Sequence, residues 1–427
     1  MLANLAKQSV PDPVREADPD SGTVLLLGNY RPALTVVRAL SAHGLRTVVG
    51  LGGHEGCVEY SRYADESWDH APLAGSGRAF MVDLVRLLAK RPDITTIYPV
   101  AEEFCACLAM HGHRLPDHVV VAAVDRAIFE FCQDKVRMLS FVKELGVGCE
   151  PFAVVRTYDR ALEAARAIGF PLVIRPLTPR VKLGDKKALI CRDEDAFRAE
   201  LPDWPEGQHA LLLQREARGV RHNVFFAADR GEVLRSLETE IYRTDQPDGT
   251  GYAVDGATVA PTPHLHDECR RMARALNYTG VGLAQFIIDP LTGRSCFLEL
   301  NPRIAGSHAI TDAAGQELSL LALKLARDEL SPQDRDPWNY PTGVRYAWSY
   351  GDMRGLKSAL SAGDVTKAQA IRWCLKSVIT GLRANVHMTW RWNDPAPTCA
   401  LFARQTPGVN RFVDHQERPI VCEVPLT

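Results

Sequence analysis

The chain has 427 residues, of which 46% are hydrophobic and 24% are charged, and 50 Lys and Arg residues stand against 52 Asp and Glu residues. This length predicts two or three domains, because a single hydrophobic core rarely grows so large. The composition is that of an ordinary globular protein and argues against a wholly disordered chain. The near balance of charges gives no indication of nucleic-acid binding, so any basic site must be local.

The cysteines and the N-terminal residues give evidence on the cellular compartment of the protein. Eleven cysteines stand singly or as Cys105-Ala-Cys107, without the Cys-x-x-Cys spacing of a zinc site. They predict reduced, mostly buried thiols in a cytoplasmic protein. Residues 1–22 are polar and lack a secretory hydrophobic core, so we expect a disordered leader. No hydrophobic run reaches the roughly 20 residues of a membrane-spanning helix.

Residues 23–120 have the pattern of a small parallel sheet covered by helices. A continuous hydrophobic run ends at Gly28, and helical and strand-like segments then alternate. No G-x-G-x-x-G follows the first strand, so dinucleotide binding is not expected there. The expected strands are 23–28, 46–50 and 95–99, and the expected helices are 32–43 and 77–90.

From residue 134 the pattern changes to helices mixed with hairpins, which predicts a second domain over residues 121–330. Asp229-Arg230-Gly231 is a typical hairpin turn between two hydrophobic runs. The expected helices are 135–145, 158–168 and 264–276, and the expected strands are 152–155, 170–175, 181–190, 210–214, 224–228 and 233–238.

A short strand near residue 300 carries the side chains that point most directly to chemistry. Its residues 297–301 read Phe-Leu-Glu-Leu-Asn and are followed by Pro302 and Arg303. Residues two apart on a strand face the same side, so Glu299 and Asn301 could bind one metal ion together. Mg²⁺ takes one or two carboxylates and completes its shell with water and phosphate oxygens. Arg303 is expected to act as a bidentate donor to an anionic group.

Together with the segments before it, this strand resembles the nucleotide site of the ATP-grasp ligases, the group that contains biotin carboxylase, carbamoyl phosphate synthetase and many carboxylate-amine ligases. The similarity runs from about residue 134 to residue 323. It implies an α/β fold, in which a small parallel-sheet domain precedes an α+β ATP-grasp module and a helical C-terminal extension follows over residues 331–427. It also implies ATP and Mg²⁺ as cofactors, with Mn²⁺ as a substitute.

The resemblance implies a set of nucleotide-binding residues. Lys135 at the head of a helix and Arg175 on a strand match positions that approach the phosphates, although the family usually has lysine at the second. A basic segment that ends at Lys187 matches the phosphate flap, but it contains a single glycine. The adenine hinge and the ribose contact correspond to Gln214, Arg215, Glu216, Ala217 and His222.

The same resemblance implies roles for the residues on the metal side. Gln285 matches the first metal ligand, which is often Glu in the family, and Glu299 and Asn301 match the bridging carboxylate and the second ligand. Arg303 would hold the transferred phosphate or the acyl substrate. Arg243 is expected to be a further contact of the γ-phosphate.

These assignments imply an ATP-dependent carboxylate-amine ligase. A substrate carboxylate would take the γ-phosphoryl group to form an acyl phosphate, and an amine would then displace phosphate. We expect the two small-molecule substrates near Tyr30-Arg31, Glu102-Glu103 and Gly306-Ser307-His308. Two alternatives remain open: a carboxylase-type enzyme that uses bicarbonate, and a non-catalytic ATP-binding protein with a regulatory or membrane-surface role.

Some of these patterns also have ordinary structural explanations. Glu299 and Arg303 alone could be a solvated ion pair at a strand end, and Glu102-Glu103 would suit a helix N-terminus. His111 and His113 lack a third ligand, so we do not expect a metal there.

The C-terminal part resembles nothing that assigns it a role. Six basic residues between positions 357 and 391 have few acids near them, and Trp373, Trp390 and Trp392 lie among them. A helix of this kind is expected to pack on its own domain with a solvated basic face. Contact with an anionic membrane surface is the alternative. We expect no nucleic-acid partner, and a homodimer remains open.

Overall fold

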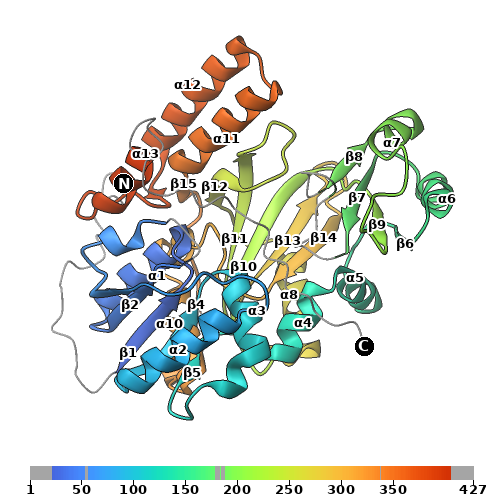
Figure 1. Ribbon diagram of the computed structural model, residues 1–427. Coiled ribbons are helices and arrows are strands. Elements are labelled where there is room, and N and C mark those ends of the chain that lie inside the picture. The colour runs from blue at the N-terminus through green and yellow to red at the C-terminus, as the bar shows by residue number, and fades with distance from the viewer. Residues whose placement is uncertain (1–21, 53–55, 178–182, 184–187, 337, 405–427) are drawn as a thin grey trace.

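The computed structural model describes residues 22–52, 56–177, 183, 188–336 and 338–404. In this part of the chain the strands form three sheets (Figure 1). A parallel sheet lies at the N-terminal end, a four-stranded sheet forms a separate lobe, and a seven-stranded sheet lies between them. The mixed α/β class expected from the sequence is confirmed. Within these residues no helix has both the length and the hydrophobicity to cross a bilayer.

The parallel sheet has the strand order β3-β2-β1-β4-β5. Along β1, Val24 and Leu26 pack with α1, whereas Leu25 and Leu27 pack with α2 and α3. Burial on both faces explains why β1 is hydrophobic throughout. The elements are β1 (Thr23–Leu27), α1 (Arg31–Ala42), β2 (Arg46–Gly50), η3 (Val58–Tyr60), β3 (Glu66–Trp68), α2 (Arg78–Lys90), β4 (Ile94–Pro99), α3 (Glu102–His111), η4 (Gly112–Arg114) and β5 (Val120–Val121).

The four-stranded sheet is antiparallel, with the order β6-β9-β7-β8. Its own small core includes Ala161, Ile174 and Phe197. The expected strand 181–190 falls mostly outside the described residues. The elements are β6 (Phe152–Val155), α6 (Tyr158–Ile168), β7 (Leu172–Pro176), β8 (Leu189–Cys191), α7 (Glu194–Glu200) and β9 (Leu211–Arg215).

The seven-stranded sheet has the order β14-β13-β10-β11-β12-β15-β16 and is covered on both faces. The face that carries Phe225 and Leu283 packs against α1 and α10, and the face that carries Val224 and Phe226 packs against α5 and α8. The elements up to residue 335 are α4 (Arg126–Gln133), α5 (Lys135–Glu144), β10 (Val220–Asp229), β11 (Glu232–Thr244), β12 (Ala253–Thr258), α8 (Pro263–Ala275), β13 (Gly280–Ile288), β14 (Ser295–Asn301), α9 (Ala309–Ala313), α10 (Leu318–Arg327) and η5 (Pro332–Arg335).

The C-terminal segment is joined to the large sheet. It contains helices, as expected, and it also adds two strands that were not predicted: β15 pairs with β12, and β16 pairs with β15. The boundary expected near residue 330 therefore divides one sheet. The elements are β15 (Arg345–Ala347), α11 (Ser349–Ala362), α12 (Lys367–Arg383), β16 (Val386–His387) and α13 (Ala396–Arg404).

Candidate active site

Polar side chains lie in a row across the seven-stranded sheet. Gln285 on β13 pairs with Glu299 on β14 and with Asn223 on β10. Residues directly opposite in antiparallel strands share a face, so these three side chains are neighbours. Asn301 follows Glu299 on the same face, and its Nδ2 donates to Glu299 Oε1 at 2.7 Å. The structure brings together the three residues predicted as metal ligands and adds Asn223; we call these four residues the polar row.

The oxygen atoms of the polar row suit a hard cation such as Mg²⁺. Glu299 is exposed, and Gln285 and Asn301 are half-buried. Asn223 Oδ1 is buried and has no hydrogen-bond partner among the described residues. In the described ranges no cluster of three His, Cys, Asp or Glu side chains could hold a metal ion. With one carboxylate and three amide side chains, the polar row fits an ion that takes its remaining ligands from nucleotide phosphates and water.

Two predicted phosphate-binding cations lie at the end of β7. The Nη2 atom of Arg175 donates to Gln214 Oε1. Burial lowers the pKa of Arg175, and the charge of Glu299 opposes that shift, so this guanidinium lies within electrostatic reach of the polar row. Lys135 begins α5, and its Nζ donates to the carbonyl oxygen of Pro176 at 3.1 Å. The Lys135 ammonium is therefore held at Pro176, the residue of β7 that follows Arg175.

Arg221 is a basic residue of this site to which the sequence assigned no role. It lies two residues before Asn223 on β10 and shares the face of the polar row. Its Nη1 donates to the carbonyl oxygen of Gly251 at 3.1 Å, and its buried Nε has no hydrogen-bond partner among the described residues. Burial lowers the pKa of Arg221, against the effect of nearby Tyr346 and Glu299. An anionic ligand at the polar row would offset the desolvation of this guanidinium.

The segment expected to form the adenine hinge connects the four-stranded sheet to the seven-stranded sheet, because β9 ends at Arg215 and β10 follows it. Gln214 is buried. The amides of Arg215 and Glu216 donate to two proline carbonyls at 3.0 and 2.9 Å. An adenine placed here would therefore be bound by other groups of the hinge, including its carbonyl oxygens and the backbone of Ala217.

His222 lies on the opposite face of β10. Adjacent residues on a strand face opposite sides, so His222 points away from the face that carries Asn223. Its Nδ1 lies 2.7 Å from Glu238 Oε1. The buried Glu238 carboxylate also accepts hydrogen bonds from Thr262, and its Oε2 lies 3.3 Å from His266 Nε2. The structure therefore does not bring His222, expected at the ribose, to the polar row.

Arg243 is held by the C-terminal helices. Its guanidinium forms a bidentate ion pair with Asp352 of α11, and the indole of Trp373 donates to the same carboxylate. Asp352 is 2% exposed, so this is a buried connection between β11 and α11. The expected contact of Arg243 with the γ-phosphate gains no support from this arrangement. Lys187 and most of the basic flap lie outside the described residues.

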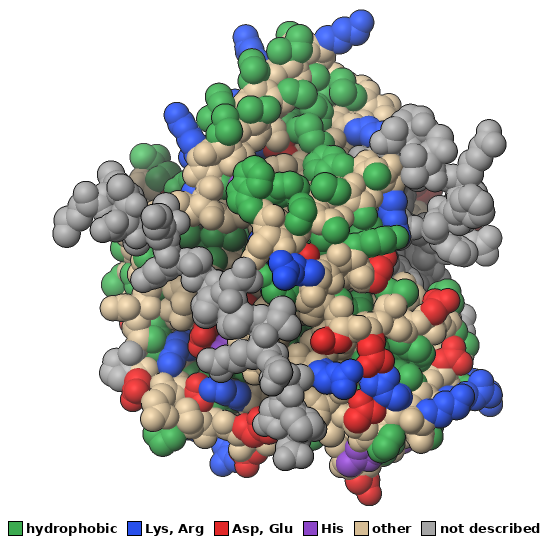
Figure 2. Space-filling view, turned by 90° about the vertical axis from the view of Figure 1, so that its left-hand side faces the viewer, with side chains coloured by type: hydrophobic (Ala, Val, Ile, Leu, Met, Phe, Trp, Pro, Cys, Tyr) green, Lys and Arg blue, Asp and Glu red, His purple; other side chains and the backbone are tan. Residues whose placement is uncertain are grey.

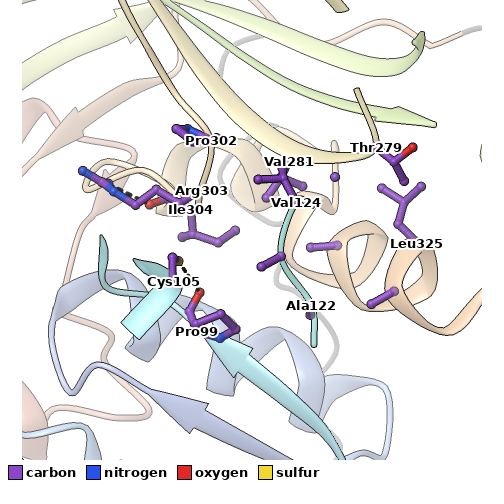
Figure 3. Close-up of a pocket in the computed structure, with 14 residues that line it drawn as sticks. Pro99, Cys105, Ala122, Val124, Thr279, Val281, Pro302, Arg303, Ile304 and Leu325 are labelled. Atoms are coloured by element: carbon purple, nitrogen blue, oxygen red, sulfur yellow. Dashed lines mark hydrogen bonds between the residues drawn. The ribbon is translucent and has the colours of Figure 1, made fainter. Parts of the chain in front are cut away.

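Arg303, just after β14, is bound by the parallel-sheet part of the protein. Its Nε and Nη2 donate to Glu102 Oε2 at 3.1 and 2.9 Å. A cavity of about 50 Å³ lies beside it, lined mainly by apolar side chains such as Pro99 and Val124 (Figure 3). Such a volume holds a water molecule or two, not a substrate. Arg303 and Glu102, each expected near a ligand, therefore bind each other and connect β14 to α3.

A second polar cluster lies between α1 and the C-terminal segment. The guanidinium of Arg31 lies 3.3 Å from the ring centre of Trp348, and a Cβ atom added at Gly306 would lie 2.3 Å from Arg31 Nη2. Tyr346 on β15 faces the same side of the sheet as the polar row. Arg31 Nη1, Trp348 Nε1 and the Tyr346 hydroxyl are buried, and none has a hydrogen-bond partner among the described residues. We call Arg31, Tyr346 and Trp348 the Arg31 cluster.

Of the three residues of this cluster, only Arg31 was expected near the substrates. Arg31 and Gly306 were predicted near the substrates because they follow strand ends. Tyr346 and Trp348 were missed, since Tyr346 lies on a three-residue strand, and Trp348 directly after it, and pairing with β12 sets the place of that strand in the sheet.

Known proteins have sequences similar to that of this chain. Residues 255–332 match the family described as the carbamoyl-phosphate synthase L chain, ATP binding domain. The carbamoyl phosphate synthase large chain of Xylella fastidiosa is 28% identical over 313 residues, which cover 64% of this chain and 28% of that protein. The mitochondrial propionyl-CoA carboxylase alpha chain of Sus scrofa is 23% identical over 331 residues, covering 71% and 43%. The chain spans less than half the length of these relatives.

Solved structures share the fold. Biotin carboxylase of Campylobacter jejuni, in a complex with β-γ-ATP, has a TM-score of 0.61 and 15% identity over 76% of this chain and 74% of that one. N5-carboxyaminoimidazole synthetase of Staphylococcus aureus has a TM-score of 0.57 and 12% identity, over 73% and 78%. The biotin carboxylase domain of Hydrogenobacter thermophilus 2-oxoglutarate carboxylase, in complex with MgADP, ADP and bicarbonate, has a TM-score of 0.57 and 19% identity, over 76% and 73%.

Proposed function

We infer that this chain is an ATP-grasp enzyme, an Mg-ATP-dependent ligase that joins a small carboxylate to an amine, because residues 255–332 match the ATP binding domain of the carbamoyl-phosphate synthase family and solved biotin carboxylases share the fold. The polar row is the observation that carries the inference, since its oxygens suit a metal ion that shares nucleotide phosphates. Lys135, Arg175 and Arg221 add positive charge near it. The position of the hinge between two sheets is suited to adenine.

In the proposed reaction, Glu299, Asn301 and Gln285 would hold Mg²⁺, or Mn²⁺, which would neutralise charge on the β- and γ-phosphates. Arg175 and Arg221 stabilise the charge that spreads over the phosphoryl oxygens. A substrate carboxylate oxygen attacks the γ-phosphorus, the bond to ADP breaks, and an acyl phosphate forms. The amine then attacks the acyl carbon, phosphate leaves, and the nitrogen loses a proton to give the amide.

The decisive experiment is ADP release with Mg-ATP and pooled amino acids, amines and carboxylic acids. Glu299→Gln should lower the substrate-dependent rate at least about 100-fold, because it removes the carboxylate that holds the ion, while the fold is kept since Glu299 is exposed. Glu206→Gln, at another exposed glutamate, is the matched control. Full activity of the Glu299 variant would exclude the metal assignment.

We further propose that the carboxylate substrate binds at the Arg31 cluster. All three unpartnered groups can donate hydrogen bonds, which favours a ligand rich in acceptor oxygens. Burial lowers the pKa of Arg31 to about 10, so the guanidinium stays charged near neutral pH and its desolvation favours an anion. Tyr346 lies within electrostatic reach of both Arg31 and Arg221, which connects the cluster to the polar row.

Steady-state kinetics with the substrates found in the ADP screen tests this placement. Arg31→Gln should raise the KM of the carboxylate at least about tenfold and change the KM of ATP less than about twofold. Arg114→Gln, at an exposed arginine, is the control. Equal effects on both substrates would place Arg31 at the nucleotide instead.

A bicarbonate-using carboxylase is the second candidate, since neighbours of this fold include the structure in complex with MgADP and bicarbonate. Bicarbonate-dependent ADP formation in degassed buffer without an amine would favour it. Amine-dependent ADP formation without bicarbonate would favour the ligase.

The proposal places the enzyme in the cytoplasm, where the exposed thiols of Cys374 and Cys399 would stay reduced.

A further inference from the structure

Helix α12 carries its hydrophobic side chains on the outside. Its buried residues are Ser377 and Thr380. A surface helix normally buries its apolar stripe, so the polarity of α12 is reversed. Four aliphatic residues spaced by three or four positions share one exposed face. They are Ile371, Leu375, Val378 and Leu382, exposed by 63%, 59%, 61% and 82%. We call them the aliphatic row.

A basic edge runs beside the aliphatic row. Arg372, Lys376 and Arg383 each follow a member of the row by one residue, which places them about 100° further around the helix. All three are exposed, and α12 contains no acidic residue. Figure 2 shows hydrophobic side chains gathered towards the top of the molecule, where the α11–α12 hairpin projects, with Lys and Arg side chains at the margins.

Large exposed apolar patches mark surfaces that contact something else. A second copy of the chain is a poor occupant, because a two-fold contact through α12 would bring the basic edges of both copies to one interface. An anionic lipid surface suits both features. Aliphatic side chains can enter the boundary of the acyl chains, while Lys and Arg reach the headgroups with their long stems.

We propose that α12 is an interfacial helix that docks the protein on an anionic membrane surface. The aliphatic row supplies the buried apolar contact, and Arg372, Lys376 and Arg383 pair with lipid phosphates. The proposal does not depend on the ligase activity, because no residue of the polar row or of the Arg31 cluster belongs to α12.

Co-sedimentation of the full chain with phosphatidylcholine vesicles, with and without phosphatidylglycerol, tests the proposal. The wild type should sediment with the anionic vesicles only, and less so at high salt. Leu375→Gln/Leu382→Gln and, separately, Arg372→Gln/Lys376→Gln/Arg383→Gln should each weaken binding at least about tenfold. Circular dichroism and thermal unfolding should match the wild type, since all five side chains are exposed.

Two control variants remove side chains of the same kinds, basic and aliphatic, at exposed positions outside α12. Lys90→Gln/Arg114→Gln/Arg294→Gln removes three exposed positive charges, and Leu291→Gln removes a side chain that is 93% exposed. Both should bind anionic vesicles as the wild type does. If the charge control lost as much vesicle binding as the α12 variants, the effect would come from net charge alone and the proposal would be overturned. Absence of vesicle binding by the wild type would also overturn it, as would a dimer in light scattering that dissociates when Leu375 and Leu382 are replaced.

Discussion

Glu238 is the centre of a buried polar network on the face of β10 opposite the polar row. Burial alone would raise the pKa of Glu238, but hydrogen bonds from His222 and Thr262, together with the nearby His266, lower it to about 2. The carboxylate therefore stays ionised inside the protein. These contacts give His222 a structural partner and connect β10 and β11 to the start of α8.

Replacing Glu238 with glutamine should lower the free energy of unfolding by about 3 kcal/mol near neutral pH, because buried donors lose a charged acceptor. The folded pKa of Glu238 lies below the unfolded value of about 4.3, so its stabilisation is complete above that value and is lost as the pH falls towards 2. Urea unfolding at a series of pH values measures the difference from wild type. Glu206→Gln is the exposed control, and a difference that stays constant down to about pH 2 would contradict the network.

At the scale of elements, Arg243 connects β11 to the C-terminal helices. The bidentate pair with Asp352 and the hydrogen bond from Trp373 hold α11 and α12 against the large sheet. The packing of α12 against polar groups also explains why its exposed side is hydrophobic and its buried side is polar. Its polar buried side includes Thr380, whose hydroxyl donates to Asp255 at 3.0 Å, so the interior contact is made by polar side chains.

Arg243→Met should lower the free energy of unfolding by about 3 kcal/mol, because Asp352 would lose its charged partner. The turnover number of the folded enzyme should stay within about twofold of wild type. Thermal unfolding and single-substrate kinetics separate the two effects, with Arg294→Met as an exposed control. A large fall in the turnover number at unchanged stability would instead support the predicted contact of Arg243 with the γ-phosphate.

Across the whole molecule, a buried ion pair joins the two ends of the described chain. Arg38 on α1 is 3% exposed, and its Nε donates to Asp394 Oδ2 at 2.9 Å. Ser61 Oγ donates to the same oxygen at 2.7 Å, and the amide of Arg62 donates to Oδ1 at 3.0 Å. Burial lowers the pKa of Arg38 to about 10, which leaves it charged at neutral pH. The segment before α13 is therefore part of the core assembly.

Asp394→Asn should destabilise the protein by about 3 kcal/mol, because the Arg38 charge would remain buried without its counter-ion. Urea unfolding followed by intrinsic fluorescence measures this loss. The exposed Asp117→Asn is the matched control and should fall within about 0.5 kcal/mol of wild type. An equally small effect at Asp394 would show that the C-terminal segment is only loosely joined to α1.

The local sequence pattern by itself predicted most of the helices and strands. It also singled out the candidate site residues Lys135, Arg175, Gln285, Glu299 and Asn301. These residues lie on elements with clear periodicity, and Glu299 and Asn301 share a face by their spacing alone. Only the tertiary structure decided which face of β10 contributes to the polar row. β10 is buried on both sides along most of its length, so it shows no alternation, and pairing with β13 selects Arg221 and Asn223 over His222.

The tertiary structure also decided the role of the C-terminal segment. β15 has three residues and β16 has two, which is too short for a periodic signal, and their places in the sheet depend on pairing with residues far away in the chain. The composition of α12 showed a basic helix, but the face that it buries depends on what α11 and the sheet present to it. Tyr346, Trp348 and the aliphatic row therefore became visible only in the folded molecule.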